Sequence, residues 1–455
     1  MTKKRTIKLN LFMLASGHHH GAWRHPDVPR DQDLELAHFA SLAKTAERGK
    51  FDALFLQDLV GVRESLGREA MRHGDHGVVQ LDPLLVLASL AAVTEKIGLI
   101  ATASTTYNQP FQVARKFSSL DHLSRGRAGW NIVTSTDEEE AHNFSFNETV
   151  PHDERYRRAE EFVDVVRGLW DSWEEGAFPR DKKTGVYLED KKMHHLNHRG
   201  KYFKVRGPLN IPRSPQGHPI LVQAGSSPAG QDLSARVADI VFTVNPTLEI
   251  AQEFYAKFKK LIRAKGRDPD SVVVMPGIFP VIADTEEKAR KKFNELQDLV
   301  HPAFGVGILG KMIGNFDLTK YPLDGPVPDL PITDEQQGRQ LSLIKLARDQ
   351  KLSIRQLYMR VIGGRGHVQV VGTPEQVADK MEEWFVNQGG DGFNVMPSHF
   401  PGGLEDFVDG VVPILQRRGL FRTEYSGATL RDHLGLAVPE NQFAITSSGR
   451  PASVA

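Results

Sequence analysis

The sequence predicts an α/β protein, a (β/α)8 TIM barrel with large insertions. Eight short apolar runs alternate with segments whose apolar residues recur at helical spacing. Strands that alternate with helices pair in parallel, because each crossover requires a helix. A barrel of this kind needs about 250 residues, so a chain of 455 leaves about 200 for insertions and a tail.

The expected elements follow these runs in chain order. We expect strands at residues 7–14, 51–56, 97–103, 128–133, 219–223, 239–243, 272–283 and 392–396. We expect helices at residues 33–48, 82–96, 110–123, 152–173, 227–237, 248–265, 375–388 and 404–418. The second helix illustrates the reasoning, since Asp82 suits the N-cap and Pro83 suits the first helical position.

Composition separates the barrel from three irregular segments. Residues 174–218 are polar and lack periodicity, and residues 285–365 carry helical stretches broken by glycines and a proline-rich run. We therefore assign residues 1–436 to a single barrel domain containing these two insertions. Residues 437–455 are rich in Ser, Ala, Gly and Pro, and we expect a flexible, poorly ordered tail there.

Charge and cysteine content exclude several classes of function. The 57 basic and 57 acidic residues balance, which argues against a nucleic-acid partner bound by phosphate neutralisation. The chain has no cysteine, so disulfides, thiolate metal sites and cysteine nucleophiles are excluded. The apolar run at 81–93 is too short to span a bilayer, and the basic N-terminus lacks a signal-peptide pattern. We expect a cytoplasmic protein with no membrane partner, assembled as a homodimer or homotetramer.

The clearest candidate site follows the fifth expected strand, at the end of the barrel where such folds place their active sites. The run from Gln223 to Gly230 passes from strand into helix and contains Ser226, Ser227 and Pro228. Backbone N–H groups and the helix dipole make this junction an anion site, and the hydroxyls add donors for phosphate oxygens. The alternative is that the serines only cap the helix.

Three other polar residues are candidates for the same end of the barrel. His152 and Tyr156 stand four residues apart near a helix start, so they share a face and could hold the same anion. The alternative is a capping histidine beside a half-buried tyrosine. Asp58 ends the second expected strand, where a carboxylate accepts hydrogen bonds from a ligand or binds a metal.

The histidines after the first strand, His18 to His20, raise the question of a metal. A metal-dependent hydrolase on this barrel needs further imidazole or carboxylate ligands at later strand ends. The fifth and sixth strands end without them, and His399 after the eighth strand lacks company in the sequence. We therefore expect no metal, and keep a metal-dependent TIM-barrel hydrolase as the alternative class. Rossmann, P-loop and nucleophile-elbow motifs are absent.

Longer motifs resemble those of a known family. The matching stretches are His20-Gly-Ala-Trp-Arg-His25, Ala46-Glu-Arg-Gly-Lys-Phe-Asp52, Gly129-Trp-Asn-Ile-Val-Thr-Ser135, His152-Asp-Glu-Arg-Tyr156, Arg206-Gly-Pro-Leu209, Pro212-Arg-Ser-Pro-Gln-Gly217, Gln223-Ala-Gly-Ser-Ser-Pro228 and Phe421-Arg-Thr-Glu-Tyr425. Spread in order over residues 7–436, they resemble the bacterial-luciferase-like flavin monooxygenases. The similarity is to the branch of nitrilotriacetate monooxygenase component A and dibenzothiophene-sulfone monooxygenase.

This resemblance implies a cofactor, a partner and a set of binding residues. Members use reduced FMN from a separate NAD(P)H:flavin oxidoreductase and react it with O2, so the protein need supply neither nucleophile nor metal. By resemblance, Ser227 and Tyr156 hold the FMN phosphate with Ser226 nearby. Asp58, Ser104 and His152 match positions that contact the flavin, and Asn131 lies beside its ring. A deazaflavin-using relative and a cofactor-binding protein without turnover are further alternatives.

The substrate prediction rests on residues near the expected flavin face. Trp23, Phe55 and Phe242 would form a flat apolar pocket, and His20 is assigned as the catalytic polar group facing the reacting oxygen, its alternative role being packing. No concentrated Arg or Lys cluster appears at the strand ends. The prediction is therefore an aromatic or organosulfur substrate with sulfone-type C–S cleavage, the alternative being an aminopolycarboxylate such as nitrilotriacetate. Residues 285–365 are expected to form a lid.

Overall fold

The computed structural model describes residues 5–75, 77–225, 227–331 and 337–444. Eight parallel strands close into a barrel, because β8 pairs with β9 as well as with β7. In chain order they are β1 Lys8–Phe12, β2 Ala53–Leu56, β3 Gly98–Ser104, β4 Ala128–Val133, β7 Ile220–Gln223, β8 Ile240–Thr243, β9 Val273–Ile282 and β11 Gly392–Val395. Each overlaps one of the eight expected strands, and the predicted fold class is confirmed.

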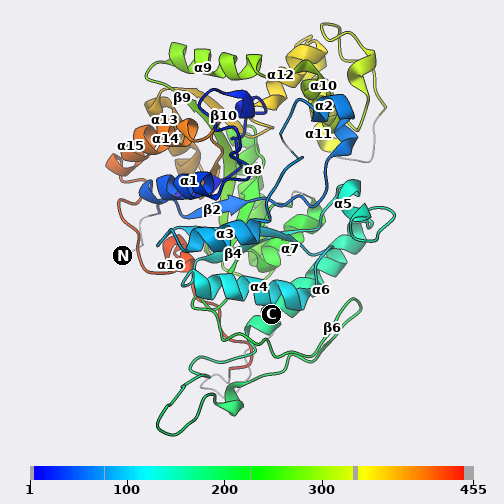
Figure 1. Cartoon of the computed structure of the whole chain (residues 1–455). Coiled ribbons are helices and arrows are strands. Elements are labelled where there is room, and N and C mark those ends of the chain that lie inside the picture. The colour runs from blue at the N-terminus through cyan, green and yellow to red at the C-terminus, as the bar shows by residue number, and fades with distance from the viewer. Residues whose placement is uncertain (1–4, 76, 226, 332–336, 445–455) are drawn as a thin grey trace.

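Helices surround the strands (Figure 1). Those that overlap the expected helices are α1 Leu36–Arg48, α3 Pro83–Ala91, α4 Pro110–Leu123, α6 His152–Trp170, α7 Pro228–Val237, α8 Leu248–Ala264, α13 Pro374–Val386, α14 Gly402–Asp406 and α15 Val412–Arg417. A π-helical turn, Phe407–Val411, interrupts the helix expected at 404–418. Short additional helices are η1 Ala22–Arg24, η2 Glu64–Leu66, α2 Arg68–Met71, α5 Glu138–His142, η3 Asp190–Lys192, η4 Pro269–Ser271 and α16 Leu430–Leu434.

Side-chain alternation along the strands explains the layers of the barrel. On β1, Leu9 and Leu11 pack outward in the cluster shared with the helices. Phe12 points inward and shares the interior with Phe55, Ile100, Ile220, Val222, Ile240, Phe242, Val273, Met275 and Met396. Leu430 and Leu434 of α16 belong to this interior cluster, so α16 closes the barrel at the end where the strands begin.

Two elements differ from the expected pattern. Helix α3 ends at Ala91 rather than near residue 96 because the Glu47 carboxylate accepts the N–H groups of residues 95–97 and turns the chain toward β3. An unpredicted strand, β10 Val368–Gly372, pairs in parallel with residues 278–282 of β9. Because β10 is buried only at its first and last residues, it lacks the continuous apolar run that marks the other strands.

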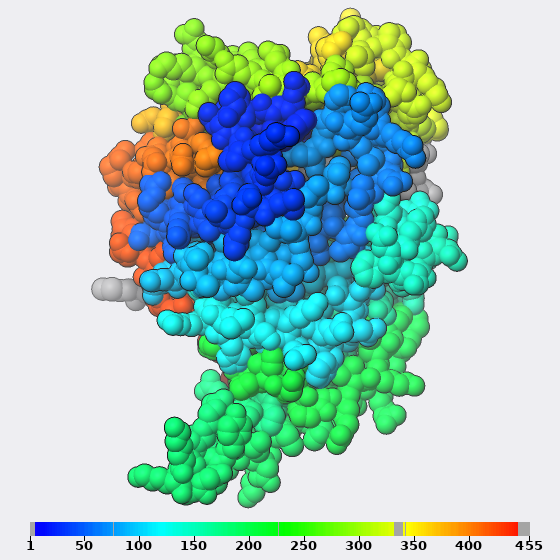
Figure 2. All heavy atoms as spheres, viewed as in Figure 1, coloured from blue at the N-terminus to red at the C-terminus, as the bar shows by residue number. Residues whose placement is uncertain are grey.

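The described part of residues 285–365 forms four main helices beside the barrel. They are α9 Glu286–Asp298, α10 Pro302–Met312, α11 Gln337–Asp349 and α12 Ile354–Ile362, with η5 Leu318–Lys320 between the second and third. A separate apolar cluster joins α10, α11 and α12 to Leu66 and Ala70, which follow β2. Figures 1 and 2 show α10, α11, α12 and α2 gathered at one corner of the molecule.

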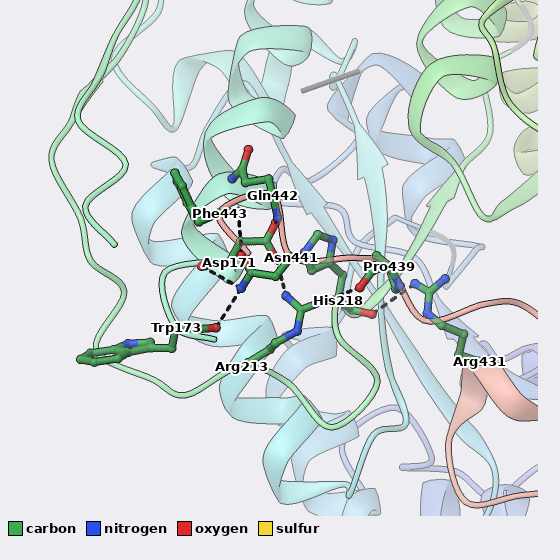
Figure 3. A network of polar contacts seen from close by, with 9 residues as sticks. All are labelled: Asp171, Trp173, Arg213, His218, Arg431, Pro439, Asn441, Gln442 and Phe443. Atoms are coloured by element: carbon green, nitrogen blue, oxygen red, sulfur yellow. Dashed lines mark hydrogen bonds and ion pairs between the residues drawn. The ribbon is translucent and has the colours of Figure 1, made fainter. Parts of the chain in front are cut away.

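Residues 174–218 extend from the barrel as a lobe that carries the short pair β5 His198–Arg199 and β6 Lys204–Val205 (Figures 1 and 2). The described part of the expected tail, residues 437–444, packs where this lobe joins the barrel. Asn441 Nδ2 donates to the Asp171 and Trp173 carbonyls at 3.1 and 3.0 Å (Figure 3). These long-range hydrogen bonds join the stretch to residues that composition alone does not connect with it. Residues 445–455 lie outside the described residues.

Asp171 is the centre of this polar network and is only 3% exposed. It accepts hydrogen bonds from Arg213 and, at 2.7 Å, from His218 Nε2. Burial raises the pKa of Asp171, but His218 and Arg213 outweigh it and hold that pKa below its ordinary value. The Arg213 guanidinium also donates to the Pro439 carbonyl, so one buried carboxylate ties the lobe to the C-terminal segment.

Among the described residues, none of the helices combines the length and the hydrophobicity that crossing a bilayer requires.

Candidate active site

Three of the predicted cofactor residues meet at the start of α7. Ser227 is the N-cap, and its Oγ accepts the N–H of Gly230 at 3.1 Å. His152 opens α6, and its Nε2 lies 3.3 Å from Ser227 Oγ. The His152 and Tyr156 ring centroids are 4.9 Å apart, and a Cβ on Gly230 would lie 2.9 Å from the Tyr156 hydroxyl. An imidazole, a phenol and a serine therefore converge on one helix N-terminus.

This convergence is chemically suited to a phosphate. The capping role of Ser227 is present, but a hydroxyl that accepts a backbone N–H still has its own proton to donate. Asp153 Oδ1 lies 3.0 Å from His152 Nδ1, which orients the ring with Nε2 toward Ser227. The positive end of the helix dipole adds to the attraction that these donors exert on an anion. Ser226, the fourth predicted phosphate residue, lies outside the described residues.

The predicted flavin-ring residues face the barrel interior from β3 and β4. Asn131 Nδ2 donates to Thr102 Oγ1 at 2.8 Å, while Asn131 Oδ1 is buried without a hydrogen-bond partner among the described residues. Ser104 Oγ accepts from the Ser135 hydroxyl at 2.9 Å and from the Thr106 N–H at 3.1 Å. A buried acceptor such as Asn131 Oδ1 costs free energy unless a donor reaches it, and a flavin ring carries N–H donors.

Asp58 lies just after β2 in a separate depression that it lines with Gln80, Asp82 and Asn143. Burial raises the pKa of Asp58 to about 6, with further contributions from the charges of Asp82 and Glu140. The carboxyl can therefore donate a hydrogen bond below about pH 6, and above that pH it is mainly an ionised acceptor. In the part of the chain that is described, the hydrogen bonds of His152 and Ser227 go to Asp153, to each other and to Gly230, and not to Asp58.

The three consecutive histidines occupy different environments. His18 Nε2 lies 2.8 Å from the Phe12 carbonyl and Arg365 contacts its Nδ1, and burial followed by the Arg365 charge puts its pKa well below the ordinary value. His19 Nε2 lies 3.2 Å from Gln297 Oε1, and burial lowers its pKa to about 4. Both rings are therefore neutral at pH 7.

His20, the predicted catalytic residue, is 5% exposed and meets Phe304 of α10 edge to face at 5.2 Å. It lines a pocket with His18, Ser16, Asp75 and Gln80. The Ser16 hydroxyl donates to Asp75, and burial raises the pKa of that carboxyl. The packing role considered for His20 is thus present, while its position in the pocket wall also suits contact with a ligand.

The predicted aromatic substrate residues separate into two places. Phe55 and Phe242 pack against each other and against Phe12 with ring centroids 5.0–5.9 Å apart, forming an aromatic floor in the barrel interior. Trp23 lies instead on η1 with 37% of its surface exposed. The structure therefore groups two of the three.

Two basic residues that sequence reasoning missed lie beside this floor. The His367 ring stacks on Phe242 at 5.2 Å with an interplanar angle of 2°, and its Nδ1 would lie 2.3 Å from a Cβ on Gly277 of β9. Arg365 contacts His18, whose ring meets Phe12 at 4.6 Å. Both residues immediately precede β10, so recognising that strand would have placed them near a strand of the barrel wall.

Comparisons with known proteins identify the class to which this site belongs. A family model described as luciferase-like monooxygenase matches residues 11–392. The chain belongs to this family and is a flavin-dependent monooxygenase, as the motifs predicted. The alternative of a metal-dependent hydrolase receives no support from any of these comparisons.

Within the family, the chain is similar to members of the predicted branch. It is 53% identical to N-acetyl-S-(2-succino)cysteine monooxygenase of Bacillus subtilis (strain 168), covering 97% of this chain and 99% of that one. It is 47% identical to nitrilotriacetate monooxygenase component A of Aminobacter aminovorans (98% and 99% covered) and 43% identical to dibenzothiophene-sulfone monooxygenase of Rhodococcus erythropolis (97% and 99%). A crystal structure of riboflavin lyase with modified FMN superposes with a TM-score of 0.84 at 34% identity, covering 95% and 97% of the two chains.

Proposed function

We propose that the chain is the oxygenase of a two-component system, in which a separate NAD(P)H:flavin oxidoreductase supplies reduced FMN and O2 oxidises a small organic substrate. The observation that carries this proposal is the convergence of Ser227, His152 and Tyr156 on the N-terminus of α7. Bound reduced flavin supplies the electrons with which O2 is activated, so the protein need not contribute a metal or a nucleophile. The 47% identical relative is named component A, which supports a two-component arrangement.

The remaining residues have supporting tasks in this proposal. Ser227, Tyr156 and His152 hold the phosphate, and Asn131 Oδ1 and Ser104 Oγ meet polar atoms of the ring. The FMN reported with the 34% identical riboflavin lyase supports this choice of cofactor. His20 faces the reacting oxygen from the pocket wall.

Helices α9 and α10 support the pocket from outside. Gln297 of α9 contacts His19, and Phe304 of α10 contacts His20. In their proposed role as part of a lid, they keep bulk water from the reacting flavin.

For the substrate we propose an organosulfur compound whose carbon–sulfur bond is cleaved. Two relatives are named for organosulfur substrates, an S-succinylated cysteine at 53% identity and an aromatic sulfone at 43%. The aromatic floor of Phe12, Phe55 and Phe242 suits the apolar part of such a molecule. A second candidate is an aminopolycarboxylate, favoured by the placement of Arg365 and His367 beside this floor and by the nitrilotriacetate relative.

Product analysis tests the proposal. The purified chain, FMN, NADH, O2 and a flavin reductase are incubated separately with N-acetyl-S-(2-succino)cysteine, dibenzothiophene sulfone and nitrilotriacetate. Oxidation of a sulfur substrate that depends on both proteins supports the proposal. Conversion of nitrilotriacetate alone selects the second candidate. A chain that binds neither oxidised nor reduced FMN would overturn the flavin assignment.

A further inference from the structure

Three side chains able to bind a metal meet where the loop after β1 contacts the loop after β11. The ligand-capable atoms of His25, Asp27 and His399 all lie within 4.8 Å of one another. They form the one such group found among the described residues. In the sequence, no other candidate ligand lies near His399. Closure of the barrel brings His25 and Asp27, from the other end of the chain, next to it.

The separations in this group are close to those of a coordinated ion. The His25 and His399 ring centroids are 4.3 Å apart at an interplanar angle of 34°, and His25 Nδ1 lies 3.9 Å from Asp27 Oδ2. Tetrahedral zinc with bonds of about 2.0–2.1 Å places neighbouring ligand atoms about 3.3 Å apart. The side chains would therefore have to approach by at most about 1.5 Å, which rotamer adjustment on a partly exposed loop allows.

The surroundings of His399 leave one of its nitrogens available. Ser398 Oγ lies 3.1 Å from His399 Nδ1, and a ring that donates from Nδ1 keeps the Nε2 lone pair for a metal. A Cβ on Gly402 would lie 3.0 Å from that Nε2, so the glycine keeps the adjacent space open. His399 itself is buried, whereas Asp27 is exposed, which gives an ion a route from solvent.

Two interactions compete with an ion. The Asp27 N–H donates to His25 Nδ1 at 3.3 Å, a long hydrogen bond that an ion would replace. The charge of Lys292 acts on His399, although Lys292 is paired with Asp406 at 2.8 Å. We therefore expect a moderate affinity.

The backbone around the group is already fixed. The N–H groups of His18 and His19 donate to the Pro397 and Ser398 carbonyls at 2.9 and 3.0 Å, and the Phe400 N–H donates to the Ser16 carbonyl at 2.9 Å. These bonds hold the two loops together before any ion binds. The same loop, from Ser16 to His20, lines the pocket that contains His20.

We propose that His25, Asp27 and His399 form a site for one divalent transition-metal ion such as Zn²⁺, which clamps the β1 loop to the β11 loop. Two imidazoles and a carboxylate are ligands that zinc and cobalt accept, and water completes the coordination. The ion lies outside the proposed flavin chemistry and acts by fixing one wall of the pocket. This site is independent of the substrate assignment.

Titration of the chelator-treated full chain with ZnCl2 or CoCl2, followed by calorimetry and by the visible spectrum of Co²⁺, tests the site. We expect one ion per chain and a higher Tm when it is bound, because the ion binds the native state. Ser398→Ala should lower the affinity about 10–100-fold by removing the partner of His399 Nδ1. Asp27→Asn and His399→Gln should lower it at least as much.

A second histidine pair provides the matched control. His73 and His301 stack at 3.5 Å, and Glu69 lies 3.1 Å from His73 Nε2, but these residues do not form a three-ligand group. His73→Gln should leave the binding unchanged. The proposal is overturned if no ion binds at one per chain, if His73→Gln removes the ion, or if Asp27→Asn and Ser398→Ala both keep wild-type affinity. Asp27 is exposed, so its variant remains informative even if His399→Gln does not fold.

Discussion

Removing the Ser227 hydroxyl should weaken the binding of reduced FMN by about 1–2 kcal/mol, or about 5–30-fold in Kd. Ser227 would donate a charge-assisted hydrogen bond to the phosphate from a helix N-terminus. The substitution has a second effect, because Ser227 Oγ also accepts the Gly230 N–H at 3.1 Å. Losing that cap costs about 1 kcal/mol of folding stability, so Ser227→Ala alone does not separate the two roles.

Ser227→Asp separates the role of Ser227 in binding the phosphate from its role as the helix cap. Aspartate caps a helix as well as serine does and interacts favourably with the helix dipole, so the Tm should be preserved. Its charge would stand where the phosphate binds, and the affinity for FMN should fall further than in Ser227→Ala. Tyr156→Phe removes the phenol hydroxyl near Gly230 without touching the cap, and should weaken FMN binding at unchanged Tm.

The assay is anaerobic titration of photoreduced FMN, with reduced riboflavin as the comparison ligand. Riboflavin lacks the phosphate, so its affinity should be nearly the same in all the variants. Two results would refute the reasoning: unchanged FMN affinity in both Ser227→Ala and Tyr156→Phe, or equal losses for FMN and riboflavin.

The remaining predictions address ionisation, stability, the partner and the substrate. Because burial raises the pKa of Asp58 from 3.8 to about 6, its ionised form destabilises the fold above that pH. In urea unfolding, Asp58→Asn should therefore raise the free energy of unfolding by up to about 3 kcal/mol at pH 8 and change it little at pH 4. The pKa of Asp171 is lowered, so the contribution of its carboxylate to folding stability is present above the ordinary aspartate pKa and is lost as the pH falls below it. Asp171→Asn should lower the free energy of unfolding by about 3–5 kcal/mol at pH 7 and expose residues 437–444 to proteases. The chain with FMN alone should not consume NADH measurably, and rapid consumption without a reductase would contradict the two-component proposal. Arg365→Gln should raise KM about tenfold or more for a carboxylate-bearing substrate while changing it little for dibenzothiophene sulfone; equal effects on both would remove Arg365 from substrate recognition.

Local pattern was sufficient to predict most of the barrel. The apolar runs at β1, β3 and β4 are buried along nearly their full length, and the cap at Asp82 accepts the N–H groups of Leu84 and Leu85 as its position suggests. The end of α3 was not predictable in this way, since the Glu47 side chain that receives residues 95–97 lies far away in sequence. Strand β10 escaped prediction because it is half exposed and depends on a neighbour, β9, for its pairing.

The candidate site shows the same division. Ser227, His152 and Tyr156 could be anticipated because each lies at a helix start that follows a strand, and the barrel topology brings such positions to one end. The positions of Arg365 and His367 beside the aromatic floor could not be anticipated, because they depend on the path by which residues 285–365 return to the barrel. Trp23 was expected beside Phe55 and Phe242, but the turn into η1 places it on an exposed surface. The meeting of His25 with His399 likewise depends on which loops closure of the barrel brings together.

The first strand of the barrel, β1, cannot complete its pairing until the last strand, β11, has been synthesised. Lys8 to Leu11 align with Gly392 to Val395, so β1 has a free edge on that side until residue 395 has left the ribosome. At about 5–20 residues per second this interval lasts about 20–80 s, during which an apolar strand is available to other chains. Helix α16, which closes the barrel at the end where the strands begin, is synthesised later still, so this end of the barrel also stays open until then. The nascent protein should therefore depend on chaperones for most of its synthesis, and fragments that stop before β11 should aggregate rather than fold.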